Sequence, residues 1–575
     1  MHILLFKRNL SLLLAGIFLL SACQPALWGT PQPPPTPILP TATFTLPPPT
    51  LTSIFTPLPP TFTPTPVVID QTLLWASPAV PSQLRELLLQ NGFQISESQQ
   101  ASVSHFMDVV QPVDNSQNTS IWTYALVAPF PTLVDDVTSQ DLHSAWSASL
   151  SGPFAGIPLL MEESTLKTFS ALWGEPADGV VQIVPADELL DTAWNQMPAW
   201  AIIPFESIEP KWKVLMIDGQ SPIQKGFDPR VYPLIATYQL TCADPCPDPK
   251  QLSFQNRNPN KLATVILTGV TALVRATAAT MDAKGILYPG EAVREVLLEA
   301  DITHINNEVP FYSHCPSPDP NQETLVFCSA PRYIQLLTDI GTDVMELSGD
   351  HFADYGQDAM FETIDIYKEN KIPYYGGGLN IDEGSKPLLL EVNGNKLMFI
   401  GCNYKEGYST ATDTVPGSVP CDFAYMTEQI AAYRAQGYLP ISTFQYHEYE
   451  IAEATPQQQI DFRVMADAGA VVVSGSQAHV PQVMEFYADA FIHYGLGNLF
   501  FDQVEKTGRN PKQNEFIDRH IFYDGRYLGV ELVTAFLEDY ARPRMMKPAE
   551  RDKFLLEYFA KSGWEFLQAR NDEIK

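Results

Sequence analysis

The chain has 575 residues, a length that predicts about three domains rather than one. Its 66 acidic residues outnumber its 35 basic ones, and the formal net charge is -31 at pH 7. This balance argues against a protein that binds nucleic acid and against one that binds anionic lipid through a basic face, because both classes need a positive field. An acidic surface suits a protein that binds cations, although solubility alone also accounts for it.

Residues 1–22 are predicted to be a lipoprotein signal peptide. Lys7 and Arg8 precede an apolar run from Leu10 to Leu20, which is short for a membrane span but typical of a secretory signal. The run ends in Leu20-Ser21-Ala22-Cys23, which resembles the bacterial lipobox. The resemblance implies that Cys23 is acylated and tethers the protein to a membrane, at the cell surface or periplasmic face. The alternative is an ordinary secreted protein with a buried Cys23.

The segment from Cys23 to residue 68 is predicted to be a stalk. Residues 24–68 contain no charged side chain, and Pro and Thr dominate the stretches PQPPPTPILPTATFTLPPPT and TPLPPTFTPTP. Such a composition cannot bury a core and favours extended polyproline geometry. A semi-rigid stalk of this kind lifts the globular part of the chain off the surface.

Six cysteines remain after Cys23, and they fall into three pairs of near neighbours. The pairs are Cys242 and Cys246, Cys315 and Cys328, and Cys402 and Cys421. In an exported protein they predict three local disulfides rather than metal ligands, although the connectivity cannot be deduced from the sequence. Cys242 and Cys246 have the spacing of zinc ligands, but no second pair with that spacing accompanies them.

Residues 69–255 are predicted to form a smaller α/β domain. SQLRELLLQNGF has apolar residues at helical spacing with Gly92 as a C-cap, and strands are expected in LLWASP, IWTYALVAPF, GVVQIVPA and AWAIIPFESI. The segment AWAIIPFESIEPKWKVLMIDGQSPI resembles the closing part of type II periplasmic solute-binding domains. This resemblance carries no ligand residues, so a working receptor and an accessory domain without a ligand both remain open. The polar residues 241–261 mark the boundary that follows.

Strands and helices alternate again between residues 260 and 540. A helix is expected over 329–341, with Ser329 as its N-cap and Gly341 as its C-cap. Four successive predicted strands end in loops that carry, in chain order, Glu308, then Asp350 with His351, then His447 with Glu448, and then Gln477 with His479. Since side chains converge at the strand ends of an α/β sheet, this series predicts one composite site.

The C-terminal part is predicted to be a hairpin followed by a helix. RHIFYDGRYLGVELV places Asp524-Gly525 at a hairpin turn, and residues 541–575 contain a helix with an apolar face. That face is formed by Phe554, Leu555, Tyr558 and Phe559. His304 and His493 lie in apolar contexts and are expected to be core residues.

The order of motifs over roughly residues 260–535 resembles the CapA family of capsule and poly-gamma-glutamate synthesis. The motifs are INNEVP, SGDHFADYG, YYGGGLNIDEGSKPLLLEVNGNK, GSQAHVPQ and HYGLGNLFFDQ. The resemblance implies a four-layer α/β/β/α sandwich related to the calcineurin-like metallophosphatases, with its site at the strand ends. The family's Asn-x-Glu is kept at Asn306 and Glu308, and its final Tyr-Ser-Leu-Gly-Asn survives as a segment that ends at Asn498.

Several positions depart from the family pattern. The first strand, which ends in Gly-Asp in the family, reads Gly269-Val270, and Asn-Asn-His has become Gly349-Asp350-His351. His-Trp-Gly reads Gln445-Tyr446-His447, with Glu448 next and a register that can shift by one residue, and Gly-x-His-Pro-His has Gln477 in place of its first histidine. A two-metal phosphoesterase holds two ions about 3.5 to 4 Å apart, and the loss of an Asp and two His argues against such a cluster.

The remaining residues allow one divalent ion, Mn, Mg or Zn, or no ion at all. The candidate ligands are Glu308, Asp350, His351, His447, Glu448 and His479. Asn306, Gln445, Gln477 and Asn498 are expected to line the same site.

The CapA resemblance implies a lipid-anchored surface protein that acts in synthesis, retention or remodelling of an extracellular polyanion, poly-gamma-glutamate or capsule. Its partners would be the membrane, through Cys23, and a capsule or polyglutamate synthase complex. A competing hypothesis is an exported metal-dependent phosphoesterase with His351 and His479 as catalytic residues. A third is a solute-binding receptor whose ligand occupies the domain at residues 69–255.

Overall fold

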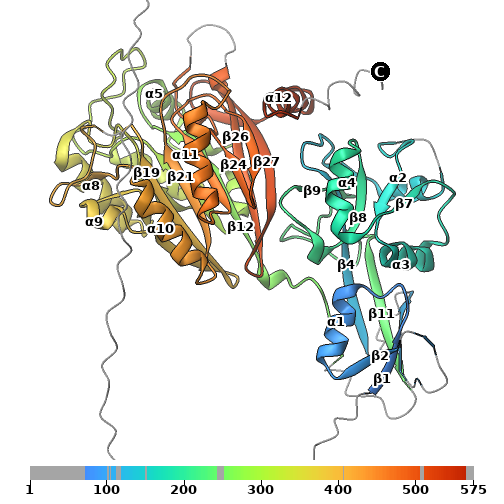
Figure 1. Ribbon diagram of the computed structural model, residues 1–575. Helices are drawn as coiled ribbons and strands as arrows, with labels where there is room; N and C mark the ends of the chain where they lie inside the picture. The colour runs from blue at the N-terminus through green and yellow to red at the C-terminus, as the bar shows by residue number, and fades with distance from the viewer. Residues whose placement is uncertain are drawn as a thin grey trace, which may run out of the picture. The chain divides into compact units, whose positions relative to one another are not determined.

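The computed structural model describes residues 72–564 except 97, 100–102, 104, 112–117, 149–151, 243–251, 406 and 505–510 (Figure 1). The predicted signal peptide, Cys23 and the stalk lie outside the described residues, as do Cys246 and the side chain of Cys242. Among the helices that are described, none is both long and apolar enough to cross a membrane. Residues Ile69–Lys575 group into one compact unit, so the boundary near residues 255–260 stays a prediction.

The region 69–255 folds around a mixed sheet with the strand order β2-β1-β3-β11-β4-β8-β6-β7, and β9 also pairs with β4. The strands are β1 (Thr72–Ala76), β2 (Phe93–Ser96), β3 (His105–Val110), β4 (Thr119–Pro129), β6 (Leu159–Met161), β7 (Val181–Ile183), β8 (Trp200–Pro204), β9 (Trp212–Val214) and β11 (Ile235–Cys242), with β5 (Asp136–Val137) and β10 (Met216–Ile217) as a separate pair. The helices are α1 (Ser82–Gln90), α2 (Ser139–Trp146), α3 (Glu163–Trp173) and α4 (Leu189–Asn195).

These elements confirm the α/β class predicted for residues 69–255. The long strand β4 pairs antiparallel with β11 over one part of its length and with β8 over another, so it joins two groups of strands. Gly92 follows the end of α1 with φ at +89°, a left-handed conformation that glycine adopts without a steric penalty.

The second region contains two larger sheets. The first has the order β16-β15-β14-β12-β26-β27-β28, and the second has the order β18-β19-β21-β22-β24-β23. The first sheet is built from β12 (Leu262–Thr268), β14 (Ile302–Asn307), β15 (Thr342–Glu346), β16 (Tyr374–Tyr375), β26 (Asn514–Tyr523), β27 (Arg526–Glu538) and β28 (Arg542–Met545). In addition, β13 (Val270–Thr271) pairs with β14, and β25 (Asn498–Phe500) pairs with β13. The second is built from β18 (Leu388–Val392), β19 (Asn395–Asn403), β21 (Leu439–Gln445), β22 (Val472–Ser476), β23 (Met484–Tyr487) and β24 (Ala490–His493).

Helices cover the outer faces of the two sheets. The helices of this region are α5 (Arg275–Lys284), α6 (Arg294–Glu299), α7 (Ile334–Asp339), α8 (Gly356–Glu369), α9 (Ile381–Gly384), α10 (Phe423–Arg434), α11 (Pro456–Asp467) and α12 (Pro548–Lys561). Apolar side chains of both sheets meet between them, among them Val265, Leu267, Phe399, Ile441 and Phe491. Helices α5 to α8 pack on the first sheet through Met281, Leu297, Leu337 and Ile364. Helices α10 and α11 pack on the second through Ile430 and Met465 (Figure 1).

This order of helices, sheet, sheet and helices confirms the predicted four-layer α/β/β/α sandwich. Within each sheet the strands that lead to the predicted site run parallel, since β14 pairs with β15 and β21 pairs with β22 in that sense. Their carboxyl ends therefore lie at one edge of each sheet.

One predicted helix cap is wrong. Ser329 does not cap the helix that follows it, because the first helical turn begins at Pro331 and its N-cap is Ala330. The buried Ser329 hydroxyl instead donates to the carbonyl of Leu273, 3.1 Å away. Gly341 follows the end of α7 with φ at +78°, as the sequence predicted.

The C-terminal predictions are confirmed. β26 and β27 form an antiparallel hairpin, and Asp524 and Gly525 make its turn with φ values of 50° and 75°. The four residues predicted for the apolar face of α12 are the ones that the helix buries.

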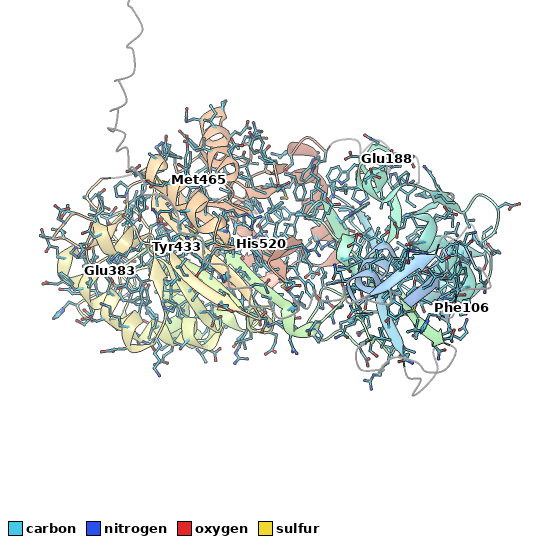
Figure 2. All side chains as sticks on the ribbon, turned by 60° about the horizontal axis from the view of Figure 1, so that its bottom comes forward. Phe106, Glu188, Glu383, Tyr433, Met465 and His520 are labelled. Atoms are coloured by element: carbon cyan, nitrogen blue, oxygen red, sulfur yellow. A yellow bond between two sulfur atoms is a disulfide. The ribbon has the colours of Figure 1, made fainter. Side chains whose placement is uncertain are left out.

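The histidines predicted to be core residues are buried. His304 Nε2 lies 2.8 Å from the hydroxyl of Tyr375, and His493 Nδ1 lies 2.6 Å from Asp518 Oδ2. His520, which Figure 2 labels, is also fully buried on β26 and contacts the hydroxyl of Tyr527.

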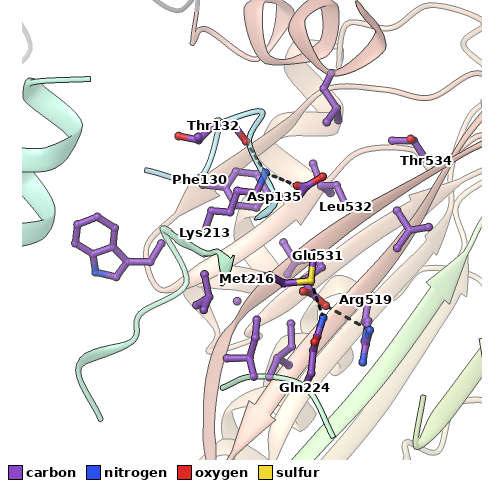
Figure 3. A pocket seen from close by; sticks show the side chains of 18 of the residues that line it. Phe130, Thr132, Asp135, Lys213, Met216, Gln224, Arg519, Glu531, Leu532 and Thr534 are labelled. Carbon is purple, nitrogen blue, oxygen red and sulfur yellow. Dashed lines mark hydrogen bonds and ion pairs between the residues drawn. The ribbon is translucent and has the colours of Figure 1, made fainter. Parts of the chain in front are cut away.

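The region 69–255 packs against the second region through aromatic and charged side chains. The ring centroid of Phe130 lies 5.0 Å from that of Phe486 and 6.2 Å from that of Phe559 on α12. Asp135 pairs with Lys213 and with Arg551, at 2.6 Å in each case. Phe130, Asp135, Lys213, Arg551 and Phe559 border a cavity of about 280 Å³, to whose walls β26 and β27 also contribute (Figure 3).

Candidate functional site

Loops from both sheets meet where their parallel strands end. Gln445, the last residue of β21, donates through Nε2 to Glu308 Oε1 and to Asp350 Oδ1, at 3.3 Å in each case. Glu308 follows β14 and Asp350 follows β15, so one amide of the second sheet links two carboxylates of the first. The strand ends that the sequence predicted to converge are therefore joined directly.

Glu308, Asp350 and His351 form a compact group at the centre of the site. One ligand atom from each residue lies within 4.8 Å of the other two. Glu308 and Asp350 are only 1% and 7% exposed. Gly349 allows this geometry, because a Cβ at that position would lie 2.4 Å from the carbonyl oxygen of Glu308.

Two histidines of the site are held through the same ring nitrogen. His351 Nδ1 donates to Asp354 Oδ2 at 2.8 Å, and His479 Nδ1 donates to Asn498 Oδ1 at 2.9 Å. Each partner fixes the ring orientation and the tautomer, which leaves Nε2 available. This is how metal-binding histidines are commonly supported in proteins.

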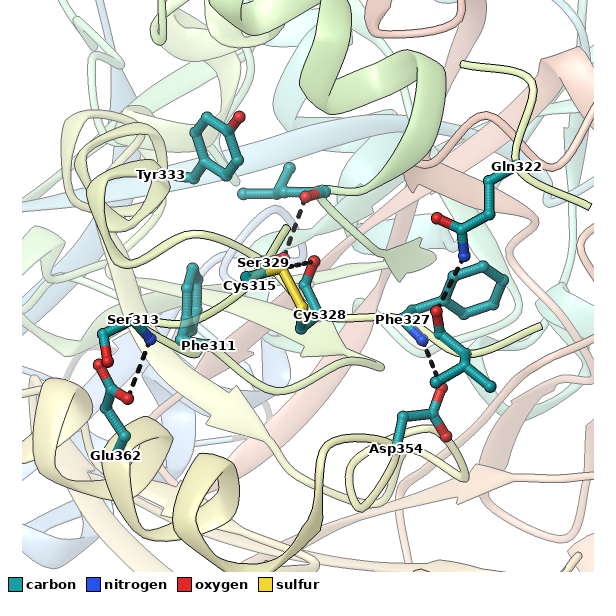
Figure 4. Close-up of a disulfide and its surroundings, with 12 residues drawn as sticks. Phe311, Ser313, Cys315, Gln322, Phe327, Cys328, Ser329, Tyr333, Asp354 and Glu362 are labelled. Carbon is teal, nitrogen blue, oxygen red and sulfur yellow. Dashed lines mark hydrogen bonds between the residues drawn. A yellow bond between two sulfur atoms is a disulfide. The ribbon is translucent and has the colours of Figure 1, made fainter. Parts of the chain in front are cut away.

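A loop closed by a disulfide contacts His351 and its partner Asp354. The disulfide between Cys315 and Cys328 confirms the predicted pair, and it fixes the position of Phe327 next to it (Figure 4). The Phe327 N–H donates to Asp354 Oδ2 at 2.6 Å, and its ring centroid lies 4.7 Å from that of His351. The predicted pair of Cys402 and Cys421 is likewise a disulfide.

Amide and hydroxyl side chains continue the network into the second sheet. Gln445 also donates to Gln477 Oε1, and Ser476 Oγ donates to Gln445 Oε1 at 2.7 Å. Asn306 Nδ2 donates to Ser476 Oγ at 3.3 Å. The residues predicted to line the site thus lie in it.

The loop after β22 is backbone-strained. Gln477 and His479 have φ values of 87° and 56°, in the left-handed backbone region that residues other than glycine rarely adopt. Such conformations cost about 1–3 kcal/mol each and tend to occur at functional sites. Because this strain positions two of the predicted side chains, it supports a functional role for the loop.

Burial and charge act differently on the two central carboxyl groups. Burial, followed by the nearby Asp350, raises the pKa of Glu308 to about 8. Burial alone would raise the pKa of Asp350 as well, but His351 and Lys405 outweigh it and hold that pKa below its usual value. One proton shared unequally between neighbouring carboxyls is the expected result of bringing two acids together.

The pKa values of the two histidines are also shifted in opposite directions. Burial would lower the pKa of His351, but its bond to Asp354 and the charge of Glu308 outweigh burial and raise that pKa to about 9. For His479, burial dominates and lowers the pKa to about 4. His479 is therefore neutral near neutral pH, whereas the acidic partners of His351 stabilise a positive charge on its ring, which a divalent ion at Nε2 would supply in place of a proton.

The donor set suits a divalent cation. Among the described residues, no hydrogen-bond donor reaches the buried atoms Glu308 Oε2 and Asn306 Oδ1. These two acceptor oxygens lie beside a carboxylate and an imidazole. Mn and Mg prefer oxygen ligands of this kind, and Zn prefers a set with more nitrogen. The residues present thus fit one divalent ion, and they do not identify it.

Two predicted ligands lie away from this centre. The ring of His447 contacts Tyr404 and Tyr449, with centroids 5.0 and 5.3 Å apart. Glu448 is about one third exposed, and its Oε1 lies 3.6 Å from His479 Nε2. The part played by either residue in metal binding stays a prediction.

Val270, where the family has an aspartate, belongs to a small apolar cluster with Val309, Phe327 and Phe501. Gly269 before it is required by a close approach, since a Cβ there would lie 2.2 Å from the carbonyl oxygen of Gly497. The chain therefore keeps the backbone path at the end of the first strand, but an apolar side chain that packs against its neighbours stands where the family has a metal ligand.

Sequence reasoning missed Lys405. Its Nζ lies 2.6 Å from Asp350 Oδ2, and its backbone N–H donates to Asn403, the last residue of β19. The signal was available, because β19 is one more parallel strand whose end lies beside that of β21. Applying the strand-end argument to this strand as well would have found the lysine.

Residues 264–503 match the family model described as "Bacterial capsule synthesis protein PGA_cap". Capsule biosynthesis protein CapA of Bacillus anthracis is 25% identical over 253 residues, which are 42% of this chain and 61% of that protein. PGA biosynthesis protein CapA of Bacillus subtilis (strain 168) is 29% identical over 175 residues, 30% of this chain and 45% of that protein. The matches confirm the resemblance that the motifs predicted, and they span about half the length of each relative.

One solved structure, an ABC-type phosphate transport receptor from Vibrio cholerae, is 13% identical to the chain. The likeness covers 31% of this chain and 88% of that receptor, with a TM-score of 0.25. A score this low adds no argument about a ligand.

Proposed function

We propose, from the CapA-type match of residues 264–503, that the protein acts in the synthesis, retention or remodelling of an extracellular polyanion, poly-gamma-glutamate or capsule. The observation that carries the proposal is that the matched segment contains every strand end of the site. It includes Glu308, Asp350 and His351 from the first sheet and Gln445 and His479 from the second.

Charge explains why this site, rather than the surface at large, would receive a polyanion. A chain with a net charge of -31 repels a polymer of carboxylates over most of its surface. Lys405 brings positive charge into the site, where it pairs with Asp350. A divalent ion held beside them adds charge and binds carboxylate or phosphate oxygens.

The chain's own residues would hold such an ion and orient its ligand. Glu308, Asp350 and His351 are the proposed ligands, and Asp354 orients the imidazole through Nδ1. Gln445 donates to one oxygen of each carboxylate, Glu308 Oε1 and Asp350 Oδ1, and so fixes the orientation of both groups.

A metal-dependent phosphoesterase is the second candidate. The observation that favours it is the support of two imidazoles through Nδ1, by a carboxylate for His351 and by an amide for His479. A metal ion in a phosphoesterase supplies charge stabilisation and lowers the pKa of bound water. The polyanion role is preferred because two family histidine positions are occupied here by Gln445 and Gln477.

Binding of defined polymers by the full-length protein tests the proposal. Isothermal titration with poly-gamma-glutamate in the presence of Mn²⁺ is expected to show binding that EDTA weakens at least tenfold. Asp350→Asn should weaken binding similarly, because it removes a charge from the ion site. Neutral dextran of matched length is the control, and equal binding of dextran and poly-gamma-glutamate would contradict the proposal.

A phosphodiester assay with added Mn²⁺ separates the second candidate. Turnover that is lost in both His351→Ala and His479→Ala would establish the hydrolase. No turnover by the wild-type protein would exclude it while leaving the binding experiment unaffected.

We also propose that Cys23 is acylated and that the protein works at the membrane surface beside a polymer synthase complex. The support is the lipobox-like Leu20-Ser21-Ala22-Cys23 together with the capsule-type match. Labelling with an alkyne fatty acid should mark the wild-type protein and spare Cys23→Ala. Crosslinking in cells followed by mass spectrometry should recover membrane synthase subunits, and recovery of none would count against the complex.

A further inference from the structure

Lys405 places an ammonium group among the acidic side chains of the site. Its Nζ lies 2.6 Å from Asp350 Oδ2 and 3.8 Å from Glu448 Oε2. The lysine stands two residues after β19, and the bond from its backbone N–H to Asn403 Oδ1, 2.9 Å long, holds its backbone. The side chain is 38% exposed, so Asp350 anchors an ammonium that stays open to solvent and to a ligand.

The site contains two groups of side chains. One group consists of Glu308, Asp350 and His351, whose ligand atoms are close enough together to hold one ion. Lys405 links Asp350 to a second group, Glu448 and His479, whose Oε1 and Nε2 atoms lie 3.6 Å apart. The ammonium of Lys405 thus lies between Asp350 and Glu448.

The two oxygens of Asp350 face different partners. Oδ1 accepts from Gln445 Nε2, and Oδ2 accepts from Lys405 Nζ. A carboxylate shared by two metal ions about 3.5 to 4 Å apart would offer each oxygen to one ion. Here the oxygen that would face a second ion is already bound to a fixed cation.

We propose that the ammonium of Lys405 takes the position of a second divalent ion, so that the site binds one such ion, at Glu308, Asp350 and His351. This inference rests on the ion site of the proposed function. An ammonium is a compact point charge with three donors, so it neutralises Asp350 and Glu448 and binds anionic oxygens of a ligand. It has no empty orbital with which to bind water as a metal does.

The energetics favour a fixed cation at this place. The carboxylate of Asp350 is 9% exposed, and the side chain of His479 is 4% exposed. A buried carboxylate that loses its partner is strongly destabilised. Removal of the lysine therefore leaves Asp350 and Glu448 without the cation that lies between them, so the variant is expected to bind another cation in its place.

Metal titration of the full-length protein tests the inference. Calorimetry with Mn²⁺, checked by elemental analysis after gel filtration, should give one ion per chain for the wild type. Lys405→Met should bind a second ion, or bind Mn²⁺ at least tenfold more tightly. Lys405→Arg, which keeps the charge, should bind one ion. Lys368→Met, which removes an exposed lysine on α8, is the control for loss of a charge.

The outcomes separate this inference from the proposed function. Two ions per wild-type chain would overturn the inference without any variant, and so would a Lys405→Met protein that matches the control in both stoichiometry and affinity. No ion in the wild type but tight binding by Lys405→Met would support the role of Lys405 and contradict the proposed ion site. If Lys405→Met does not fold without metal, recovery of its circular dichroism by Mn²⁺ supports the inference, and failure to recover overturns it.

Discussion

The fully buried His520 should make the stability of the second region depend on pH. Its Nδ1 lies 2.9 Å from the hydroxyl of Tyr527, while no described residue offers a partner to its Nε2. Burial lowers the pKa of His520 from 6.5 to about 4, since the nearby Asp518 only partly offsets it and His493 adds to it. The neutral ring is therefore the form that the folded protein requires.

The sign and size of the effect follow from the two pKa values. The folded pKa lies below the unfolded value of about 6.5, so the folded state is fully stable with respect to this group above that pH and loses stability as pH falls. The loss is about 1.4 kcal/mol at pH 5.5 and approaches about 3 kcal/mol below pH 4. Nearly half of it, about 1.4 kcal/mol, is already present at pH 5.5, where few carboxylates titrate.

Urea unfolding followed by circular dichroism at pH 7.5 and 5.5 measures the effect. His520→Phe keeps a ring beside Phe491 but cannot titrate, so its unfolding free energy should change less between the two pH values than that of the wild type. The expected difference between the two proteins is about 1.4 kcal/mol. Equal pH dependence of wild type and variant would refute the reasoning, whatever the absolute cost of the substitution.

Three further predictions concern the site and the first region. Asp354→Asn should weaken Mn²⁺ binding about 10–100-fold in calorimetry, because it disturbs the orientation of His351, and an unchanged affinity would show that Asp354 is dispensable. Gly349→Ala should lower the unfolding free energy by about 1–3 kcal/mol and weaken ion binding, since the added methyl meets backbone atoms of Glu308; wild-type values for both would contradict this. If residues 69–255 form a receptor, a thermal-shift screen of amino acids, sugars and phosphate should contain a ligand that raises the melting temperature, and a flat screen removes the receptor hypothesis.

Local patterns predicted the layers of the fold because each pattern reports burial on one side of an element. The apolar face of α12 and the Asp524-Gly525 turn depend on neighbouring residues alone, and both are correct. Ser329 shows the limit of such reasoning. Its residue type and its position suggested an N-cap, but its hydroxyl instead donates a hydrogen bond to the carbonyl of Leu273, which is distant in the sequence.

The strand-end argument located the site but did not assign roles within it. It selected Glu308, Asp350, His351 and His479, which the structure brings to one edge of the two sheets. It could not show that Asp354 orients His351, because the path of a loop is set by contacts such as the one to Phe327. Lys405 was missed because the argument was not applied to the end of β19, where the lysine supplies the cation that pairs with Asp350.

The exchange of family histidines for amides changes what the carboxylates can do. An imidazole at the end of β21 would offer a lone pair to a metal ion, whereas Gln445 donates hydrogen bonds to Glu308 Oε1 and Asp350 Oδ1. Each of those two oxygens thus accepts one hydrogen bond from an amide and Asp350 Oδ2 accepts one from Lys405, so the second lone pair of each oxygen is what remains for an ion. Within the site, Glu308 Oε2 is the buried carboxylate oxygen that no described donor reaches. A site with one such oxygen and a fixed ammonium is suited to holding one ion and an anionic ligand, which is why binding of a polyanion is a better expectation for this chain than two-ion hydrolysis.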